Sequence, residues 1–288
     1  MNNEELTLKH GRMLQERLGP LGNGLSEYCF SNLYLFRKVH KYKVIFDREI
    51  FISGTTYDGH SHLMPVFDPV YIDTDYLIKS LTGFDFLYPV SDKALKKIDS
   101  KIFSISFNED DTDYVYSSEK LKTYKGRKLG RKRNLMKQFL ENFPNEAYPA
   151  CTQRKKDAQD ILDQWLKDVG YTAAQTDYYS CLEAFTNMDV LGLCGFIHYV
   201  QKEPAGFVLA KEVSPGICVF HFAKGKRKFK GVYQYMFNHF AKTYSDRFNY
   251  YNFEQDLGNP NFRKTKLSYA PDKMLKKYRI RLRNTSQY

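Results

Sequence analysis

Two carboxylates and three cations lie close together near the C-terminal end of the sequence. Glu254 and Asp256 alternate at the end of a predicted strand, so both side chains can face one side of it. Arg263, Lys264 and Lys266 follow after a Gly-Asn-Pro turn. Such a group can take a proton from an attacking nucleophile while its cations hold a phosphate, and it can equally be a structural ion-pair cluster. Glu254 and Asp256 are therefore candidate catalytic residues, with Arg263 and Lys266 as candidate phosphate ligands.

A second cluster is entirely basic. Residues 120–137 contain nine Lys and Arg side chains and no acid, and Tyr124 and two glycines are interleaved with them. This composition suits contacts with the phosphates of RNA or of a lipid headgroup. About five such contacts would give a log–log salt slope of roughly −4. Arg133 and Asn134 lie where the basic face enters a predicted helix, so they either line a cleft or cap and brace that helix.

The elements that must position these residues are clearest in the second half of the chain. Helical periodicity predicts two helices, the first ended by Gly170 and the second over 177–188. Three apolar strands, a loop, a helix and one more strand follow. This order, ααβββ-loop-αβ, is that of the GNAT acyltransferase fold. The predicted ranges are 193–200, 205–213 and 217–223 for the three strands, 232–244 for the helix and 250–254 for the last strand.

In a GNAT fold, the loop before that last helix binds the pyrophosphate of an acyl-CoA. Backbone N–H groups and the helix dipole stabilise an anion there. Here the loop 224–231 carries five cations. Lys228-x-x-Gly231 can be aligned with the usual pattern, but Tyr233 occupies its last small position. The candidate cofactor-binding residues are Lys226, Arg227, Lys228 and Gly231, and a solvated lysine-rich turn is the alternative.

The first half of the chain is predicted to be mixed α and β. A charged helix over 4–17 ends before Gly19-Pro20, and Ser26 can cap the next helix. Pro144 and Pro149 punctuate the chain, so two lobes are expected, over 1–148 and 149–288. Strands are predicted over 42–46, 50–53, 60–67, 84–89 and 102–107, with one more near the C-terminus over 278–282.

Composition limits the class of protein. Hydrophobic residues make up 42% of the chain, enough for a packed core, and the net charge of +11 favours a polyanionic partner. The N-terminus has no apolar run, and no stretch approaches the roughly 20 apolar residues that span a bilayer. A cytoplasmic protein is expected, with peripheral contact at a membrane left open. His60-x-His62 has no Cys or acidic cluster beside it, so no metal is expected. His221 lies between two phenylalanines and is expected to be a core histidine.

Two motifs carry a resemblance to a known family. Glu254-Gln-Asp-Leu-Gly258 followed by Arg263-Lys-x-Lys266-Leu-Ser-Tyr269 is similar to the closing motif of the C-terminal domain of phosphatidylglycerol lysyltransferases and their stand-alone relatives. Asp113-Tyr-Val-Tyr116, with Lys125-Gly-Arg-Lys128 and Arg131-Lys-Arg-Asn134, is similar to that family's central motif. The likeness extends over most of the chain. In the family, an aminoacyl group passes from aminoacyl-tRNA to a lipid hydroxyl.

The resemblance implies an α/β (α+β) fold of two tandem GNAT-like lobes, each a mixed, mostly antiparallel sheet flanked by helices, with a site between them. We therefore expect an acyl- or aminoacyltransferase. Its donor would be acyl-CoA or aminoacyl-tRNA, its acceptor a hydroxyl or amine of a lipid headgroup or small molecule, and no cofactor would be bound permanently. The rival is a non-catalytic module that binds RNA or an anionic membrane. The oligomeric state stays open. The candidate substrate-binding residues are Tyr116, Arg133, Asn134, Asn252, Arg263, Lys266 and Tyr269.

Overall fold

The computed structural model describes residues 2–21, 24–96 and 98–283, and the chain divides into two compact units. Unit 1 comprises Met1–Asp113, Gln255–Phe262 and Met274–Tyr288, and unit 2 comprises Tyr114–Glu254 and Arg263–Lys273. The lobe boundary expected at 148/149 falls inside unit 2. It lies in β8 (Asn145–Pro149), which pairs along its whole length with β9 (Cys194–Val200) and so belongs to the sheet of that unit.

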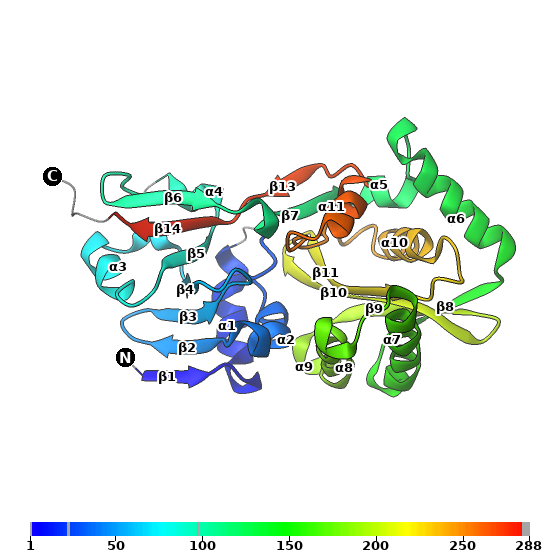
Figure 1. Cartoon of the computed structure of the whole chain (residues 1–288), viewed down its shortest axis with the longest axis horizontal. Coiled ribbons are helices and arrows are strands. Elements are labelled where there is room, and N and C mark those ends of the chain that lie inside the picture. Colours follow the sequence, from blue (N-terminus) through cyan, green and yellow to red (C-terminus); the bar gives the residue numbers. More distant parts are fainter. Residues whose placement is uncertain (1, 22–23, 97, 284–288) are drawn as a thin grey trace. The chain divides into compact units, whose positions relative to one another are not determined.

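The sheet of unit 1 has seven strands, mostly antiparallel. They are β1 (Asn2–Glu5), β2 (Lys43–Phe46), β3 (Ile50–Thr55), β4 (Ser61–Pro65), β5 (Phe86–Val90), β6 (Phe103–Phe107) and β14 (Tyr278–Leu282). Their order is β1-β2-β3-β4-β5-β14-β6, with β4 and β5 parallel (Figure 1). The C-terminal strand β14 is therefore inserted between β5 and β6. Its Ile280 is fully buried and pairs with Leu87 on one side and Ile105 on the other.

The helices of unit 1 are α1 (Gly11–Leu18), α2 (Phe30–His40), α3 (Thr74–Ser80) and α4 (Asp92–Leu95). The first two pack closely, because a Cβ added at Gly11 would lie 2.9 Å from the Phe30 ring. The helix expected over 4–17 is wrong at its start: residues 2–5 form β1 and pair with β2. These polar residues show no alternation, so nothing in the sequence predicted a strand there. Cys29, not Ser26, is the N-cap residue of α2.

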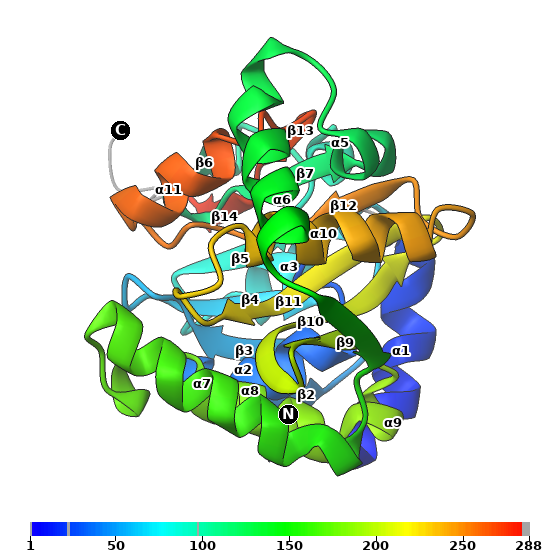
Figure 2. The same ribbon diagram turned by 90° about the vertical axis from the view of Figure 1, so that its right-hand side faces the viewer.

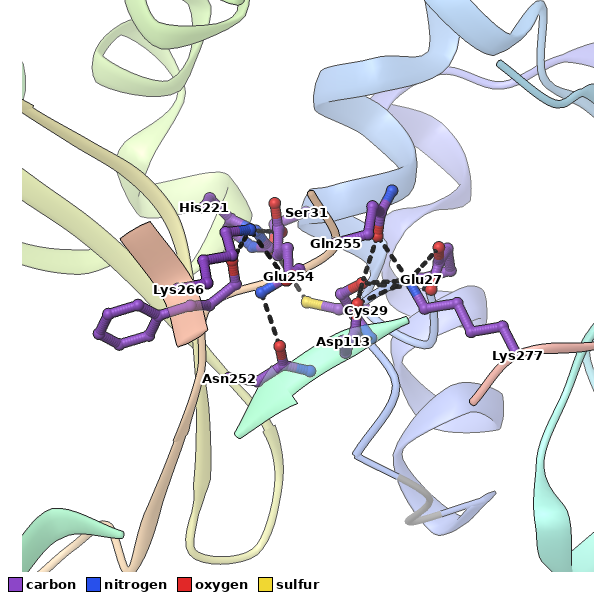
Figure 3. A network of polar contacts seen from close by, with 12 residues as sticks. Glu27, Cys29, Ser31, Asp113, His221, Asn252, Glu254, Gln255, Lys266 and Lys277 are labelled. Carbon is purple, nitrogen blue, oxygen red and sulfur yellow. Dashed lines mark hydrogen bonds and ion pairs between the residues drawn. The ribbon is translucent and has the colours of Figure 1, made fainter. Parts of the chain in front are cut away.

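Ser26 instead belongs to a buried polar cluster in unit 1. Figure 3 labels four other members of the cluster: Glu27, Asp113, Gln255 and Lys277. The Ser26 backbone N–H and hydroxyl donate to the Asp113 carboxylate over 2.8 and 3.1 Å. The Lys277 ammonium lies 2.7 Å from Asp113 and 2.6 Å from Glu27, and it also donates to Gln255. Two buried carboxylates thus share one ammonium. Burial raises the pKa of Glu27 to about 7, and the nearby positive charge of Lys277 opposes this shift.

The sheet of unit 2 also has seven strands, in the order β13-β7-β12-β11-β10-β9-β8. β11 and β12 are parallel. Besides β8 and β9, the strands are β7 (Asp113–Ser117), β10 (Glu203–Ser214), β11 (Ile217–Gly225), β12 (Tyr250–Asn252) and β13 (Lys273–Leu275). The helices are α5 (Ser118–Thr123), α6 (Gly130–Asn142), α7 (Lys155–Val169), α8 (Tyr178–Thr186), α9 (Met188–Leu191), α10 (Val232–Thr243) and α11 (Pro260–Leu267).

Helices cover both faces of this second sheet. Figures 1 and 2 show α7 and α8 on one face and α10 on the other, and α6 packs on the outer side of α10. The predicted order ααβββ-loop-αβ is confirmed, with the short α9 as an addition. The predicted class, two mixed and mostly antiparallel sheets flanked by helices, is confirmed as well. Phe220, Phe240 and Tyr251 form the centre of the apolar core between the sheet and α10.

Candidate functional site

The parallel strands β11 and β12 separate after three residue pairs. Residues 217–219 pair with residues 250–252, and then β12 ends while β11 continues to Gly225. In open α/β sheets, ligands bind beyond the carboxyl ends of parallel strands where neighbouring strands diverge. The residues that follow Val219 and Asn252 are therefore candidates for a binding or catalytic role in unit 2.

A histidine–carboxylate pair lies at this point (Figure 3). His221 Nδ1 and Glu254 Oε1 are 2.9 Å apart, and Nδ1 donates because an ionised carboxylate can only accept. His221 is the extra residue of a β-bulge: its neighbours Phe220 and Phe222 pair with consecutive residues of β10. The imidazole is fully buried, as expected for a core histidine, whereas the Glu254 side chain is 16% exposed. The imidazole thus holds the carboxylate, while part of the Glu254 side chain stays exposed.

The backbone around Glu254 is held by three further predicted residues (Figure 3). Asn252 Oδ1 accepts the Glu254 N–H over 2.7 Å, and Glu254 itself has a left-handed φ of +58°. The Lys266 ammonium donates to the carbonyls of Phe253 and Glu254 over 2.6 and 2.9 Å. The Tyr116 hydroxyl donates to the Lys266 carbonyl over 2.8 Å. Lys266 therefore fixes the end of β12 through backbone contacts.

The alternation expected for Glu254 and Asp256 does not apply, because β12 ends at Asn252 and Glu254 leaves the extended conformation. Asp256 belongs to unit 1, is fully buried and accepts the Gly258 N–H over 2.9 Å. It stabilises a turn. Arg263 lies half-buried on α11. Of the two candidate catalytic carboxylates, Glu254 is thus the one that combines exposure with a histidine partner.

Three of the four lysines of the loop 224–231, Lys224, Lys226 and Lys228, are paired with carboxylates of unit 2. Lys226 is only 3% exposed, and its ammonium lies between Asp160 and Glu203. The Arg227 backbone N–H donates to Asp168 over 2.7 Å. The positive charge that the sequence assigned to a phosphate is thus largely neutralised within the protein. The ion pairs are Lys224–Asp177 (2.8 Å), Lys226–Asp160 (2.7 Å), Lys226–Glu203 (2.8 Å) and Lys228–Glu203 (2.7 Å).

The same loop is closely packed against α6. Gly231, the N-cap of α10, has a φ of +94°, and a Cβ at this position would lie 2.1 Å from the Leu135 carbonyl oxygen. The Tyr233 hydroxyl accepts the Gly225 N–H over 3.0 Å. Protein groups therefore occupy the space beside the start of α10, where a GNAT fold would hold pyrophosphate.

The basic segment 120–137 differs from this loop, because several of its cations have no carboxylate partner. Lys132 is only 9% exposed, and its Nζ lies 3.8 Å from the centroid of the Tyr269 ring. Arg133 donates to the Tyr124 carbonyl over 2.6 Å and so braces the preceding turn, and Asn134 is exposed. Within the described part of the chain, no carboxylate lies at ion-pair distance from Lys125, Arg127, Lys128, Arg131 or Lys132.

Two buried tyrosines, Tyr124 of this segment and Tyr269, are both hydrogen-bonded to Gln234. The Tyr269 hydroxyl accepts a hydrogen bond from the Gln234 side chain, and the Tyr124 hydroxyl donates to the Gln234 carbonyl, both over 2.8 Å. Burial lowers the pKa of Lys132 to about 8, and the nearby charge of Arg131 adds to the shift. The sequence did not single out Lys132 as a site residue, because nothing in it distinguishes this buried lysine from the exposed cations next to it.

Neither a metal site nor a membrane-spanning helix is present in the described residues. Among residues 2–21, 24–96 and 98–283, no three His, Cys, Asp or Glu side chains come together as metal ligands. Over the same ranges, no helix combines the length and the apolar character needed to cross a bilayer.

These features define a protein of two GNAT-like α/β units, with a carboxylate–histidine pair at the strand divergence of the second. The chain belongs to the family of the phosphatidylglycerol lysyltransferase C-terminal domain, whose model matches residues 19–281. Family and fold together support a transferase-like role.

Two solved structures share this fold, and a curated protein is similar in sequence. A conserved protein of unknown function from Bacteroides thetaiotaomicron VPI-5482 is 23% identical, with 98% of this chain and 100% of that chain covered and a TM-score of 0.86. L-PGS from Bacillus licheniformis is 13% identical, with 98% and 94% covered and a TM-score of 0.65. An uncharacterized protein of Mycoplasmoides gallisepticum is 22% identical over 209 residues, 71% of this chain. The match spans 64% of that relative's length.

Proposed function

We propose that this protein is an aminoacyltransferase. It would take the aminoacyl group from an aminoacyl-tRNA and pass it to a hydroxyl or amine of a lipid headgroup or small molecule. The observation that carries the proposal is the partly exposed Glu254 carboxylate, held by His221 where β11 and β12 separate. Membership of the phosphatidylglycerol lysyltransferase C-terminal family supports the same class of reaction.

In the proposed reaction, the acceptor oxygen or nitrogen attacks the ester carbonyl carbon of the aminoacyl-tRNA. The Glu254 carboxylate takes the proton of that nucleophile as the new bond forms. The ester C–O bond to the tRNA ribose then breaks, and the proton passes from Glu254 to the departing ribose oxygen. His221 and Lys266 act as positioning residues, since they hold the carboxylate and its backbone in place.

The choice of an RNA donor over acyl-CoA follows from where free positive charge lies in unit 2. In the loop that would hold the CoA pyrophosphate, Lys224, Lys226 and Lys228 are paired with Asp177, Asp160 and Glu203. Its backbone packs against the Leu135 carbonyl. The segment 120–137 instead keeps exposed cations available for phosphates. This contrast supports aminoacyl-tRNA as the donor.

The test compares Glu254→Gln with wild type in single-turnover transfer from bulk aminoacylated tRNA to phosphatidylglycerol vesicles and to small amines. We expect the transfer rate to fall by about 100-fold or more, because a general base contributes 10²–10⁴-fold. Affinity for tRNA should change less than about twofold, since no RNA contact is removed. Glu141→Gln, an exposed carboxylate on α6, is the matched control and should transfer at the wild-type rate.

Equal, salt-sensitive binding of charged and uncharged tRNA, without any transfer by wild type, would favour the non-catalytic module. A Glu254→Gln variant with the wild-type transfer rate would remove Glu254 from the mechanism.

A further inference from the structure

Lys132 is a buried lysine whose charge is not balanced by an ion pair within the described residues. Its side chain is almost wholly buried over the Tyr269 ring, and no carboxylate of the described residues lies within ion-pair distance of it. Placing an ammonium in such a position is unfavourable unless an anion or several acceptors compensate for the lost water. The buried lysines Lys224 and Lys226 of the same unit do have carboxylate partners. Lys132 is therefore arranged to receive an anion from outside the chain.

Exposed cations precede Lys132 closely in the chain. Arg127 and Lys128 lie in the 3-10 turn η5 (Arg127–Leu129), and Arg131 lies in the first turn of α6, which contains no acid. Lys125 precedes them in the turn that Arg133 braces. The exposed side chains of this segment thus present positive charge from several positions next to the buried Lys132 in the chain.

The supporting backbone is held in place before any ligand binds. Tyr124 has a left-handed φ of +47°, is fully buried and is fixed through its hydroxyl to the Gln234 carbonyl. Gln234 also donates to Tyr269, the ring beneath Lys132. A preorganised surface loses less conformational entropy on binding.

The chemistry of the segment favours RNA over a membrane as its partner. Proteins that bind membranes through basic segments add exposed apolar side chains that enter the headgroup region. In this segment the large apolar side chains point inward, since Tyr124 is fully buried and Leu129 is 3% exposed. Arginines such as Arg127 and Arg131 can bind a phosphodiester with two parallel hydrogen bonds. The surface therefore fits an RNA backbone.

We propose that η5 and the first turn of α6, residues 125–132, form the surface on which the RNA of the donor docks. Lys132 makes the innermost phosphate contact, over Tyr269. The inference rests on the proposed function only for its choice of tRNA as the RNA. Docking itself requires no acyl transfer, and the two claims can fail separately.

The experiment measures the affinity for uncharged tRNA transcript at several salt concentrations between about 50 and 300 mM, a range over which phosphate contacts change the affinity steeply. Lys132→Met should weaken binding about 5-fold near 150 mM salt and lower the log–log salt slope by about 1. Arg127→Gln combined with Arg131→Gln should weaken it about 20-fold and lower the slope by about 2. Lys132→Arg, which keeps the charge, should restore most of the affinity and guards against a folding defect.

The matched control is Lys156→Gln combined with Lys167→Gln, which removes two exposed charges on α7 of the same unit. It should bind tRNA within about twofold of wild type. Equal losses in the control and the Arg127/Arg131 double variant would overturn the docking surface. So would an unchanged tRNA affinity accompanied by lost binding to phosphatidylglycerol vesicles, which would make this a membrane surface.

The two proposals remain distinguishable. If the surface variants keep their tRNA affinity while Glu254→Gln still stops transfer, the docking surface is wrong and the transferase stands. If the surface variants lose tRNA affinity but wild type transfers no aminoacyl group, the docking surface stands and the transferase is wrong.

Discussion

At the scale of single residues, Lys132 shows how burial rather than an ion pair can set a charge state. Its ammonium faces the Tyr269 ring, and the positive charge of Arg131 lies nearby. Burial, followed by the effect of Arg131, lowers the pKa of Lys132 to about 8. Burial also raises the pKa of Tyr269, so that ring stays neutral while Lys132 titrates. A buried lysine without an ion-pair partner lowers the stability of the free protein, and such a residue is expected where it takes part in binding.

This pKa shift predicts how stability depends on pH. The folded-state pKa of about 8 lies below the unfolded value of about 10.4, so the folded protein binds fewer protons between these pH values. The contribution of Lys132 to the free energy of unfolding must therefore rise with pH in this window. Relative to Lys132→Met, wild type should gain about 1–3 kcal/mol between pH 7 and pH 10. Urea unfolding at both pH values measures this.

The control is Gln138→Met at an exposed position of the same helix, which removes no titratable group, so its stability difference from wild type should not change with pH. A constant difference between wild type and Lys132→Met at both pH values would contradict the buried, unpaired state of this ammonium.

Single residues were also where sequence reasoning was weakest. Glu254 was identified because its type and its place after a strand indicate chemistry. His221 was assigned to the core, because the β-bulge that turns it toward Glu254 leaves no trace in the alternation of its neighbours. Lys226 and Lys228 were assigned to a phosphate. Their carboxylate partners come from α7 and β10, and no local pattern connects these positions.

At the scale of elements, the junction between α6 and α10 depends on one glycine. Gly231 has a left-handed φ, and its Cα lies so close to the backbone of α6 that a Cβ would overlap the Leu135 carbonyl oxygen. Gly231→Ala should therefore lower the free energy of unfolding by more than about 3 kcal/mol, because backbone strain and a steric clash combine. Urea denaturation followed by circular dichroism measures the loss.

Gly170→Ala is the matched control. Gly170 also has a left-handed φ, at the C-cap of α7, but a Cβ there would meet no atom within 4 Å. Its substitution should lower the free energy of unfolding by only about 1 kcal/mol, the ordinary effect of a non-glycine residue in this conformation. Equal losses for the two variants would show that close contact with α6 is not what constrains Gly231.

The order of elements in unit 2 was predictable, because apolar periodicity and turn residues mark each helix and strand locally. Sheet membership was not. The strand over 278–282 was predicted, but its insertion between β5 and β6 depends on contacts far apart in sequence. The end of β12 was not predictable either. Its pairing stops at Asn252 because β11 diverges there, although the alternation of apolar and polar residues continues in the sequence.

At the scale of the whole molecule, the two compact units do not coincide with the two halves of the sequence. The segment 114–148 contributes several almost fully buried side chains to the core of unit 2. They are Tyr114, Tyr116, Leu121, Tyr124, Leu129 and Phe139. A fragment that begins at residue 149 lacks all of them, and it also lacks β7 and β8.

Expression of two fragments tests this division of the chain. Residues 114–273 include all of unit 2 and should unfold cooperatively, with a heat-capacity change typical of a packed domain. Residues 149–288 should show no cooperative transition, since burying a single large apolar side chain contributes about 1.5–3 kcal/mol and six are missing. Calorimetry and denaturant unfolding measure both. A transition for 149–288 as sharp as that of 114–273 would favour the boundary expected from the prolines, because the core could then form without its first strand and α6.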